Sequence, residues 1–239
     1  MDTLEMLYEG KAKQIFKTGD PSLVLVRYKD AATAFNGEKK AELSGKGELN
    51  NRISSFFFQL LSNEGIPHHF VREVSAREQL VKKVNIIPLE VVVRNRVAGS
   101  MAKRLGLEEG QILPQPVVEY YYKNDELGDP LLTEDHVAIL NLATPAQRAR
   151  LKEMALQVNR FLSEWLDQRG IMLVDFKLEF GTDEKGEILL ADEISPDTCR
   201  FWDKETGERL DKDRFRRDLG QVVESYRKIW NRLEGDSHV

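Results

Sequence analysis

The stretch LVDFKLEFG, residues 173–181, alternates apolar and charged side chains from Val174 to Phe180. Since successive side chains of a β-strand point to opposite faces, Asp175, Lys177 and Glu179 share one face and the apolar residues share the other. We therefore predict a strand with one face in the core and three charges opposite it. A half-exposed structural strand shows the same alternation, so this stretch alone leaves both interpretations open.

A second β run, residues 187–194, follows the turn-forming segment at residues 182–186, and the two runs predict a hairpin. Hairpin pairing brings Asp192 near Glu179, and two carboxylates this close repel each other unless a proton or a cation lies between them. Magnesium prefers one or two protein carboxylates together with phosphate oxygens and water. The hairpin therefore predicts a site for nucleotide-bound Mg²⁺ at Glu179 and Asp192.

Upstream, the string IIPLEVVVRNRVAGS at residues 86–100 is a buried strand pattern that ends in Arg94, Arg96 and a turn of small residues. Ser100 then opens a short helix, whose free N–H groups attract anions. Guanidinium groups bind phosphate and carboxylate in a bidentate way, so the string predicts an anion clamp. Surface arginines after an edge strand are an equally good interpretation of these residues taken alone.

A third segment, YEGKAK at residues 8–13, places a glycine turn between two strands. Such a turn lets the backbone approach a triphosphate, with Lys11 and Lys13 on one face to neutralise it. By itself the signal is weak, because paired lysines on a hairpin are usually solvated. The nearby SGKG at residues 44–47 lacks the spacing of a phosphate-binding loop and is not assigned that function.

The remaining pattern is that of an α+β protein, with a sheet first and a helix-rich part built around the hairpin. Further strands are expected over residues 4–9, 12–17, 23–28, 70–74, 79–84 and 117–123. Apolar residues at helical spacing predict a helix that carries residues 53–61, a helix capped at residues 144–145 and a helical C-terminal segment with one apolar face over 215–230. Residues 29–47 are expected to form a polar loop.

Composition excludes several classes of protein. The 239 residues are 31% charged and 41% hydrophobic, as in an ordinary globular protein, and 40 acidic against 35 basic residues give a net charge of −5. This balance argues against nucleic acid or an anionic membrane as a partner. The N-terminal residues lack the pattern of a signal peptide and no stretch is apolar enough to span a membrane, so a cytoplasmic protein is expected.

Cysteine and histidine usage argues against disulfide and zinc chemistry. The single cysteine, Cys199, allows no internal disulfide, and His68, His69, His136 and His238 show no metal-ligand spacing with it. No activating histidine lies near Cys199 in the sequence, so we interpret this residue as a bystander rather than a nucleophile.

Together these segments closely resemble the SAICAR synthetase family over nearly the whole chain. The resemblance is carried by residues 8–13, 29–30, 33–35, 45–47, 50, 86–100, 173–181 and 192–202. It implies a two-lobed α+β fold with an N-terminal antiparallel β lobe, residues 1–85, a C-terminal α+β lobe, residues 86–239, and an ATP cleft between them. It also implies a homodimer.

The activity implied by the resemblance is that of a carbon–nitrogen ligase of purine biosynthesis. ATP, carboxyaminoimidazole ribonucleotide and L-aspartate would give the succinocarboxamide, ADP and phosphate. By position, Lys11, Ala12 and Lys13 would meet the phosphates, Glu179 and Asp192 the Mg²⁺, and residues from Lys82 to Ile86 the adenine. The residues implied to hold the ribonucleotide and the developing charge are Arg94, Ser100, Asp175, Lys177 and Arg200.

The chain departs from the family pattern at Ala31 and Ser44, where acidic residues are expected more often. Two rival functions remain open at this point. One is a phosphotransferase that phosphorylates a small metabolite without aspartate. The other is a nucleotide- or RNA-binding module that uses Arg94, Arg96, Lys103 and Arg104 as a basic patch, although the net charge and the carboxylate pair count against it.

Overall fold

The structure is a computed structural model and describes residues 5–34 and 37–235. Three residues named above, Leu4 at the start of the first expected strand, Phe35 and His238, lie outside the described residues. None of the described helices is long and apolar enough to cross a membrane.

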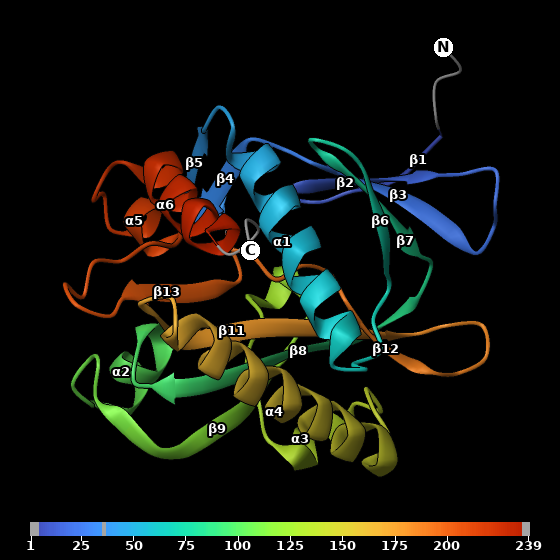
Figure 1. Cartoon of the computed structure of the whole chain (residues 1–239). Helices are drawn as coiled ribbons and strands as arrows, with labels where there is room; N and C mark the ends of the chain where they lie inside the picture. Colours follow the sequence, from blue (N-terminus) through green and yellow to red (C-terminus); the bar gives the residue numbers. More distant parts are fainter. Residues whose placement is uncertain (1–4, 35–36, 236–239) are drawn as a thin grey trace.

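The N-terminal part forms a five-stranded antiparallel sheet in the order β1-β2-β3-β7-β6 (Figure 1). Its strands are β1 (Met6–Glu9), β2 (Lys13–Lys17), β3 (Leu23–Tyr28), β6 (Phe70–Ser75) and β7 (Glu78–Lys82). Alternation along β3 buries Val24, Val26 and Tyr28, which form a small core with Val81 of β7. The strands predicted for this part are therefore present, with ends shifted by a few residues.

A second antiparallel sheet has the order β10-β9-β8-β11-β12, with β13 also paired to β11. Its strands are β8 (Asn85–Arg96), β9 (Ile112–Tyr122), β10 (Leu131–Leu132), β11 (Ile171–Thr182), β12 (Ile188–Ala191) and β13 (Cys199–Asp203). The stretch quoted first is the centre of this sheet. Its charged face is not half-exposed, because Asp175 is only 3% and Glu179 only 4% accessible. The interpretation of β11 as a half-exposed structural strand is wrong.

Two long helices cover the apolar surfaces. The helix α4 (Pro145–Asp167) begins at a capping box made by Thr144 and Gln147 and packs on β8, β9 and β11. The helix α1 (Lys46–Asn63) contacts β6 and also α6 (Val222–Glu234), as Figure 1 shows. Shorter helices are α2 (Gly99–Leu105), α3 (Glu134–Ile139), α5 (Asp213–Arg216) and the 3₁₀ turn η2 (Asp125–Leu127).

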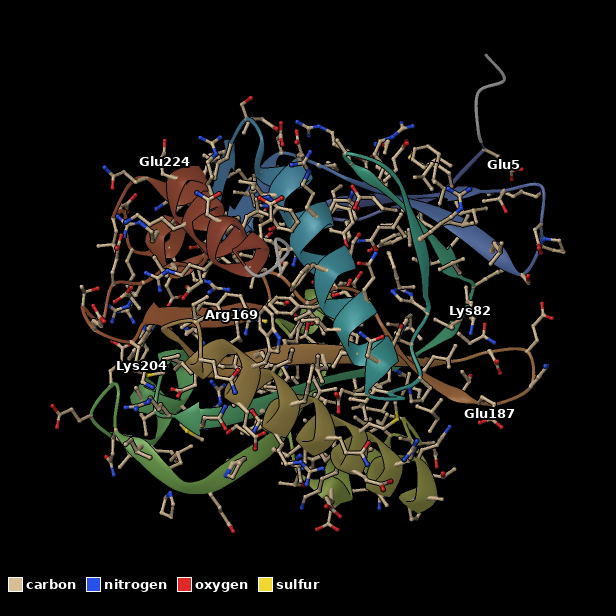
Figure 2. All side chains as sticks on the ribbon, viewed as in Figure 1. Glu5, Lys82, Arg169, Glu187, Lys204 and Glu224 are labelled. Carbon is tan, nitrogen blue, oxygen red and sulfur yellow. The ribbon has the colours of Figure 1, made fainter. Side chains whose placement is uncertain are left out.

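One large core joins α1 to the second sheet. Ile53 and Phe57 of α1 are fully buried in the same cluster as Leu178 of β11 and Tyr226 of α6. The backbone passes from the first sheet to the second at residues 83–84, next to the predicted boundary at 85 and 86. Long charged side chains such as those of Glu187, Lys204 and Glu224 extend from the outside of the fold (Figure 2).

Two expectations about local structure are corrected. The expected loop at residues 29–47 contains a hairpin of β4 (Ala31–Ala34) and β5 (Lys39–Glu42). The C-terminal segment is not one helix but α5 and α6, because Asp218, Gly220 and Gln221 have φ values of 55°, 66° and 52°. A right-handed helix cannot continue through left-handed residues. Leu219, predicted on the buried face, is consequently 45% exposed.

Candidate active site

A cleft of about 890 Å³ lies between the two sheets. Of the residues predicted for the site, Arg96 of the anion clamp and Asn85 of the adenine stretch do not line it. The others do: Lys11, Ala12, Lys13, Lys82, Ile86, Arg94, Ser100, Asp175, Lys177, Glu179, Asp192 and Arg200. They come from the β1–β2 turn and the start of β2, the end of β7, β8, α2, β11, the segment after β12, and β13. The fold therefore gathers segments from most of the chain around one space.

One end of the cleft is apolar. It is lined by Ile15, Val24 and Val26 of the first sheet, together with Val81 and Val84. Ile86, at the start of β8, is 41% exposed beside them. An apolar wall of this kind suits a purine base, and the predicted adenine stretch supplies Lys82, Lys83, Val84 and Ile86 to the lining.

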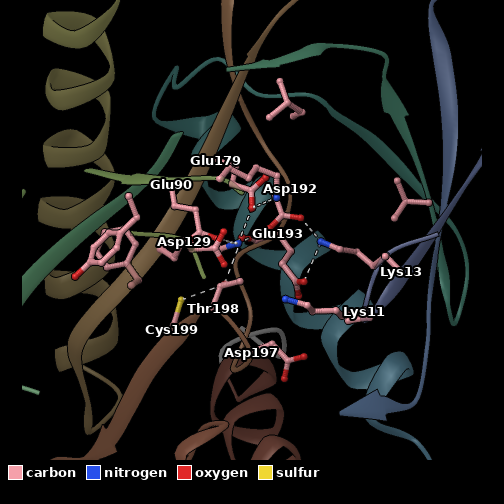
Figure 3. A pocket seen from close by; sticks show the side chains of 18 of the residues that line it. Lys11, Lys13, Glu90, Asp129, Glu179, Asp192, Glu193, Asp197, Thr198 and Cys199 are labelled. Carbon is pink, nitrogen blue, oxygen red and sulfur yellow. Dashed lines mark hydrogen bonds and ion pairs between the residues drawn. The ribbon is translucent and has the colours of Figure 1, made fainter. Parts of the chain in front are cut away.

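The two lysines after the glycine turn have different surroundings. Lys13 enters the cleft and forms ion pairs with Asp192 and, at 2.9 Å, with Glu193 (Figure 3). Burial alone would lower the pKa of Lys13, but these two carboxylates hold it well above its usual range. Lys11 is more exposed and pairs with Asp125 at 2.7 Å. Of these two lysines, only Lys13 forms ion pairs with carboxylates inside the cleft that are buried or partly buried.

Lys177 lies between the predicted carboxylates. Its Nζ is 2.5 Å from Glu179 Oε1 and 3.5 Å from Asp192 Oδ2. Glu179 faces Ala191 across the hairpin, and Asp192 then turns into the cleft with a φ of 58°. Burial raises the pKa of Asp192, yet Lys13 and Lys177 outweigh it and keep that pKa well below its ordinary value. The predicted meeting of Glu179 and Asp192 is correct.

The donor set fits Mg²⁺ of the nucleotide-bound kind. In the part of the chain that the structure describes, no group of three or more His, Cys, Asp or Glu residues is arranged to hold a metal. Two carboxylates in a cleft are what Mg²⁺ uses when phosphate oxygens and water complete its shell. Glu179 and Asp192 therefore suit a metal that arrives with a nucleotide.

The anion clamp is built around Asp175. Arg94 Nη1 donates to Asp175 Oδ2 at 2.6 Å, and Arg200 Nη1 donates to the same oxygen at 2.9 Å. Arg94 Nη2 also donates to Ser100 Oγ at 3.1 Å. At 3% accessibility Arg94 is not a surface residue, so that alternative is wrong for it. Arg96 instead donates to the carbonyl of Gly110 and does not line the cleft.

A glycine is required where Arg200 approaches α2. Gly99 has a φ of +54°, and a Cβ built on it would lie 2.3 Å from Arg200 Nη2. Any side chain here would displace the guanidinium. The small-residue turn noted in the sequence therefore positions a residue that lies about a hundred positions away.

Several residues of the cleft were not predicted. They include Glu90, Lys123, Asp129, Glu193, Lys212 and Arg216. Glu90 accepts a hydrogen bond from Lys177 Nζ at 3.2 Å. Lys123 Nζ donates to Glu179 Oε1 at 3.0 Å. Glu90 lies inside the quoted string 86–100 and Glu193 follows Asp192, so position beside a motif could have indicated both. No local signal marks Lys123 or Lys212.

None of the described histidines, nor Cys199, belongs to a cluster arranged to hold a metal ion. His69 is buried, and burial lowers its pKa to about 3, so the imidazole is neutral. His68 and His69 immediately precede β6. Cys199 lines the cleft, but burial raises the pKa of its thiol and its contact is the hydroxyl of Thr198 at 3.9 Å. Its bystander role stays a prediction.

Comparison with known proteins identifies the family. The model of the SAICAR synthetase family matches residues 6–233. The chain belongs to the SAICAR synthetase family.

Individual members of the SAICAR synthetase family are similar over their whole length. The chain is 62% identical over 239 residues to the phosphoribosylaminoimidazole-succinocarboxamide synthase of Brevibacillus brevis, with 100% of each chain covered. A SAICAR synthetase solved in complex with ADP has a TM-score of 0.94 at 50% identity, covering 97% of this chain and 98% of that one. The structure of the phosphoribosylaminoimidazole-succinocarboxamide synthase of Ehrlichia chaffeensis has a TM-score of 0.94 at 49% sequence identity, covering 96% of this chain and 98% of that one.

These findings confirm three predictions made from the sequence. They are the SAICAR synthetase family, the α+β fold with antiparallel sheets, and an ATP-dependent ligase of purine biosynthesis.

Proposed function

We propose that this chain joins the amine of L-aspartate to the carboxylate of carboxyaminoimidazole ribonucleotide, using MgATP and releasing ADP and phosphate. One observation carries the assignment of the cleft. The same face of β11 presents Asp175, which orients two arginines, and two residues later Lys177, which sits among carboxylates. An anion clamp and a phosphoryl-transfer centre are therefore about 7 Å apart along one strand.

The nucleotide would occupy the first-sheet side of the cleft. The adenine lies against the apolar end near Lys82 and Ile86, and the phosphates meet the backbone turn at Lys11, Ala12 and Lys13. Lys13 already balances the partly buried Asp192 and the buried Glu193, so it can neutralise phosphate oxygens when a nucleotide arrives with its metal. The ADP complex of a relative at 50% identity supports a nucleotide site in this fold.

Glu179 and Asp192 would hold Mg²⁺ together with phosphate oxygens. When bound, the metal supplies positive charge to the phosphoryl group during transfer. Lys123 and Lys177 pair with Glu179 and orient this carboxylate.

The ribonucleotide would be held by Arg94, Ser100 and Arg200. Asp175 holds both guanidiniums in a set geometry, with Arg94 also tied to Glu119 and Arg200 to Asp213. A relative from Saccharomyces cerevisiae, 26% identical with a TM-score of 0.81, was solved in complex with SAICAR, which supports a ribonucleotide site in this fold.

A carboxylate is a poor acyl donor, which is why ATP is consumed. A carboxylate oxygen of the ribonucleotide attacks the γ-phosphorus, giving an acyl phosphate and ADP. The unprotonated amine of L-aspartate then attacks the acyl carbon, the C–N bond forms, inorganic phosphate leaves and the nitrogen loses a proton. Lys177 is placed to stabilise the charge that develops on the transferring group.

The proposal also covers the lobes, the location in the cell and the oligomeric state of the protein. We assign residues 1–85 and 86–239 to a nucleotide-binding lobe and a metal- and substrate-binding lobe, and we expect a cytoplasmic homodimer. The exposed apolar residues Met6, Leu7 and Tyr8 on the edge strand β1 are a surface that a second copy could cover.

The test is release of ADP and phosphate by the purified protein with MgATP and carboxyaminoimidazole ribonucleotide, with and without L-aspartate. We expect release that depends on aspartate, with one amide per ADP found by mass spectrometry. Release without aspartate and without amide would favour the phosphotransferase. Salt-sensitive RNA binding with no turnover would favour the binding module.

A further inference from the structure

Lys46, the lysine of the SGKG segment, has no role in the site described so far. It begins α1 and is only 1% accessible. Its Nζ lies 2.6 Å from Asp197 Oδ2 and donates to the carbonyl of Ala31 at 3.1 Å. Burying an ammonium group costs free energy unless the group is paired, and the contact with Asp197 offsets that cost for Lys46.

Asp197 lines the cleft and has partners on both oxygens. Lys46 pairs with Oδ2, and the hydroxyl of Tyr226 donates to Oδ1 at 2.6 Å. Burial raises the pKa of Asp197, but Lys46 and the more distant Lys212 outweigh it and hold this pKa well below its ordinary value. The carboxylate is therefore ionised, and Lys46 is its principal counter-charge.

Lys212 is a partly buried lysine of the cleft that has no close carboxylate partner within residues 5–34 and 37–235. Its nearest carboxylate oxygen is Asp197 Oδ2, at 4.0 Å, whereas Lys13, Lys123 and Lys177 each have a carboxylate oxygen within 3.0 Å. Among the described residues its ammonium donates no hydrogen bond. Burial, with the nearby positive charges of Arg216 and Lys46, lowers the pKa of Lys212. Such a cation gains more from an incoming anion than a paired lysine does.

We propose that Lys46 is a positioning residue: by neutralising Asp197, it leaves the ammonium of Lys212 free to bind an anionic group of a substrate. That group is a carboxylate or a phosphate, and this inference rests on the proposed function for the identity of its carrier. Without Lys46, Asp197 would be a buried charge lacking its main partner, and Lys212 needs to move little from 4.0 Å to replace it. The substrate would then compete with Asp197 for Lys212.

The test is a cycle of the variants Lys46→Met, Asp197→Asn and the two combined, with Lys212→Met measured beside them. We expect Lys46→Met to raise the KM of one substrate about tenfold with kcat within about threefold, because binding rather than chemistry is affected. Lys212→Met should raise the same KM. The combined variant removes both charges, frees Lys212 again, and should return the KM to within about threefold of the unmodified protein.

The affected substrate identifies the anion. A higher KM for L-aspartate indicates its carboxylate, and a higher KM for the ribonucleotide indicates its phosphate or carboxylate. The control is Lys204→Met, which removes a peripheral lysine paired with Asp167 (Figure 2) and should leave every constant unchanged. The inference is overturned if the combined variant is no better than Lys46→Met, or if Lys212→Met changes neither KM.

Two further measurements keep the inference separate from folding and from the proposed function. If Lys46→Met does not fold, the test uses the two other variants. The combined variant leaves no lone buried charge, and its KM and that of Lys212→Met then test the inference. Thermal-shift titrations with succinate and with inorganic phosphate require no turnover. Stabilisation of the unmodified protein by one of them, lost in Lys212→Met, supports the inference even if no amide forms; equal stabilisation of both proteins overturns it.

Discussion

Asp175 on β11 and Arg200 on β13 are cross-strand neighbours, and Arg200 Nη1 donates to both oxygens of the Asp175 carboxylate, at 3.0 and 2.9 Å. Arg94, the cross-strand neighbour of Asp175 on β8, donates to the same carboxylate. The register of three strands thus places one buried acid between two guanidiniums. This acid fixes the orientation of both arginines, together with Glu119 beside Arg94 and Asp213 beside Arg200.

Asp175→Asn should impair ribonucleotide binding without unfolding the protein. An amide accepts through one oxygen only, and its NH₂ group would face a guanidinium donor. Each arginine keeps a second carboxylate partner, so the fold persists. We expect kcat/KM for the ribonucleotide to fall about 100-fold, equivalent to about 3 kcal/mol. The exposed Glu184→Gln on the hairpin turn is the matched control, and equal kinetics in the two variants would contradict this role.

Glu179→Gln and Asp192→Asn should weaken binding of the magnesium-nucleotide complex. Each change removes one of the two carboxylates assigned to the metal, while circular dichroism should show the fold unchanged. We expect the Mg²⁺ concentration for half-maximal turnover to rise by about tenfold or more in each variant. Calorimetry with MgADP measures the same loss without turnover. Unchanged turnover and magnesium dependence in both variants would remove Glu179 and Asp192 from the metal site.

Gly99→Ala should displace Arg200, and Gly106→Ala provides a close control at the other end of α2. Both glycines have positive φ, +54° and +64°, so alanine is strained by a similar ~1–2 kcal/mol at each. A Cβ at Gly99 meets Arg200 Nη2 at 2.3 Å, whereas a Cβ at Gly106 meets nothing within 4 Å. We expect similar losses of thermal stability, but a higher KM for the ribonucleotide only in Gly99→Ala. An equal effect on KM would mean that strain alone is responsible.

Asp211 should make stability depend on pH. Its carboxylate is fully buried and accepts the backbone N–H groups of Phe201 and Asp213. Burial, with the negative charge of Asp213 added, raises its pKa from 3.8 to about 7, although Arg200 and Arg216 act in the opposite direction. A raised folded-state pKa means that the native state holds a proton that the unfolded state has lost. The stabilisation from Asp211 is therefore present below pH 4 and is lost as the pH rises to 7.

Asp211→Asn tests this pH dependence. The variant loses one backbone hydrogen bond at every pH but no longer titrates. From pH 4 to 7 the free energy of unfolding of the unmodified protein should fall relative to that of the variant, by at most about 1.4 kcal/mol per pH unit. Urea unfolding at pH 5, 6, 7 and 8 gives the difference. A constant difference across this range would show that Asp211 is ionised throughout.

Much of the second sheet was predictable because its signals are local. Period-two alternation from Val174 to Phe180 and the turn at residues 182–186 specify β11 and its hairpin without reference to the rest of the chain. The break between α5 and α6 was not predictable from apolar spacing. It depends on residues with left-handed backbone conformation. Two of them, Asp218 and Gln221, are not glycines, so their residue types do not by themselves predict a positive φ.

By itself, the sequence indicated the family through its resemblance to SAICAR synthetases. It also determined the α+β class, the strand β11 and the meeting of Glu179 with Asp192, because strand periodicity and turn residues act over a few positions. Only the tertiary structure decided which charge neutralises which. Lys13 pairs with Asp192, 179 residues away, and Lys46 with Asp197. A local pattern specifies the face on which a side chain lies, whereas its partner depends on which strands and helices pack together. Once two charges are buried, the cost of leaving either unpaired holds that arrangement in place.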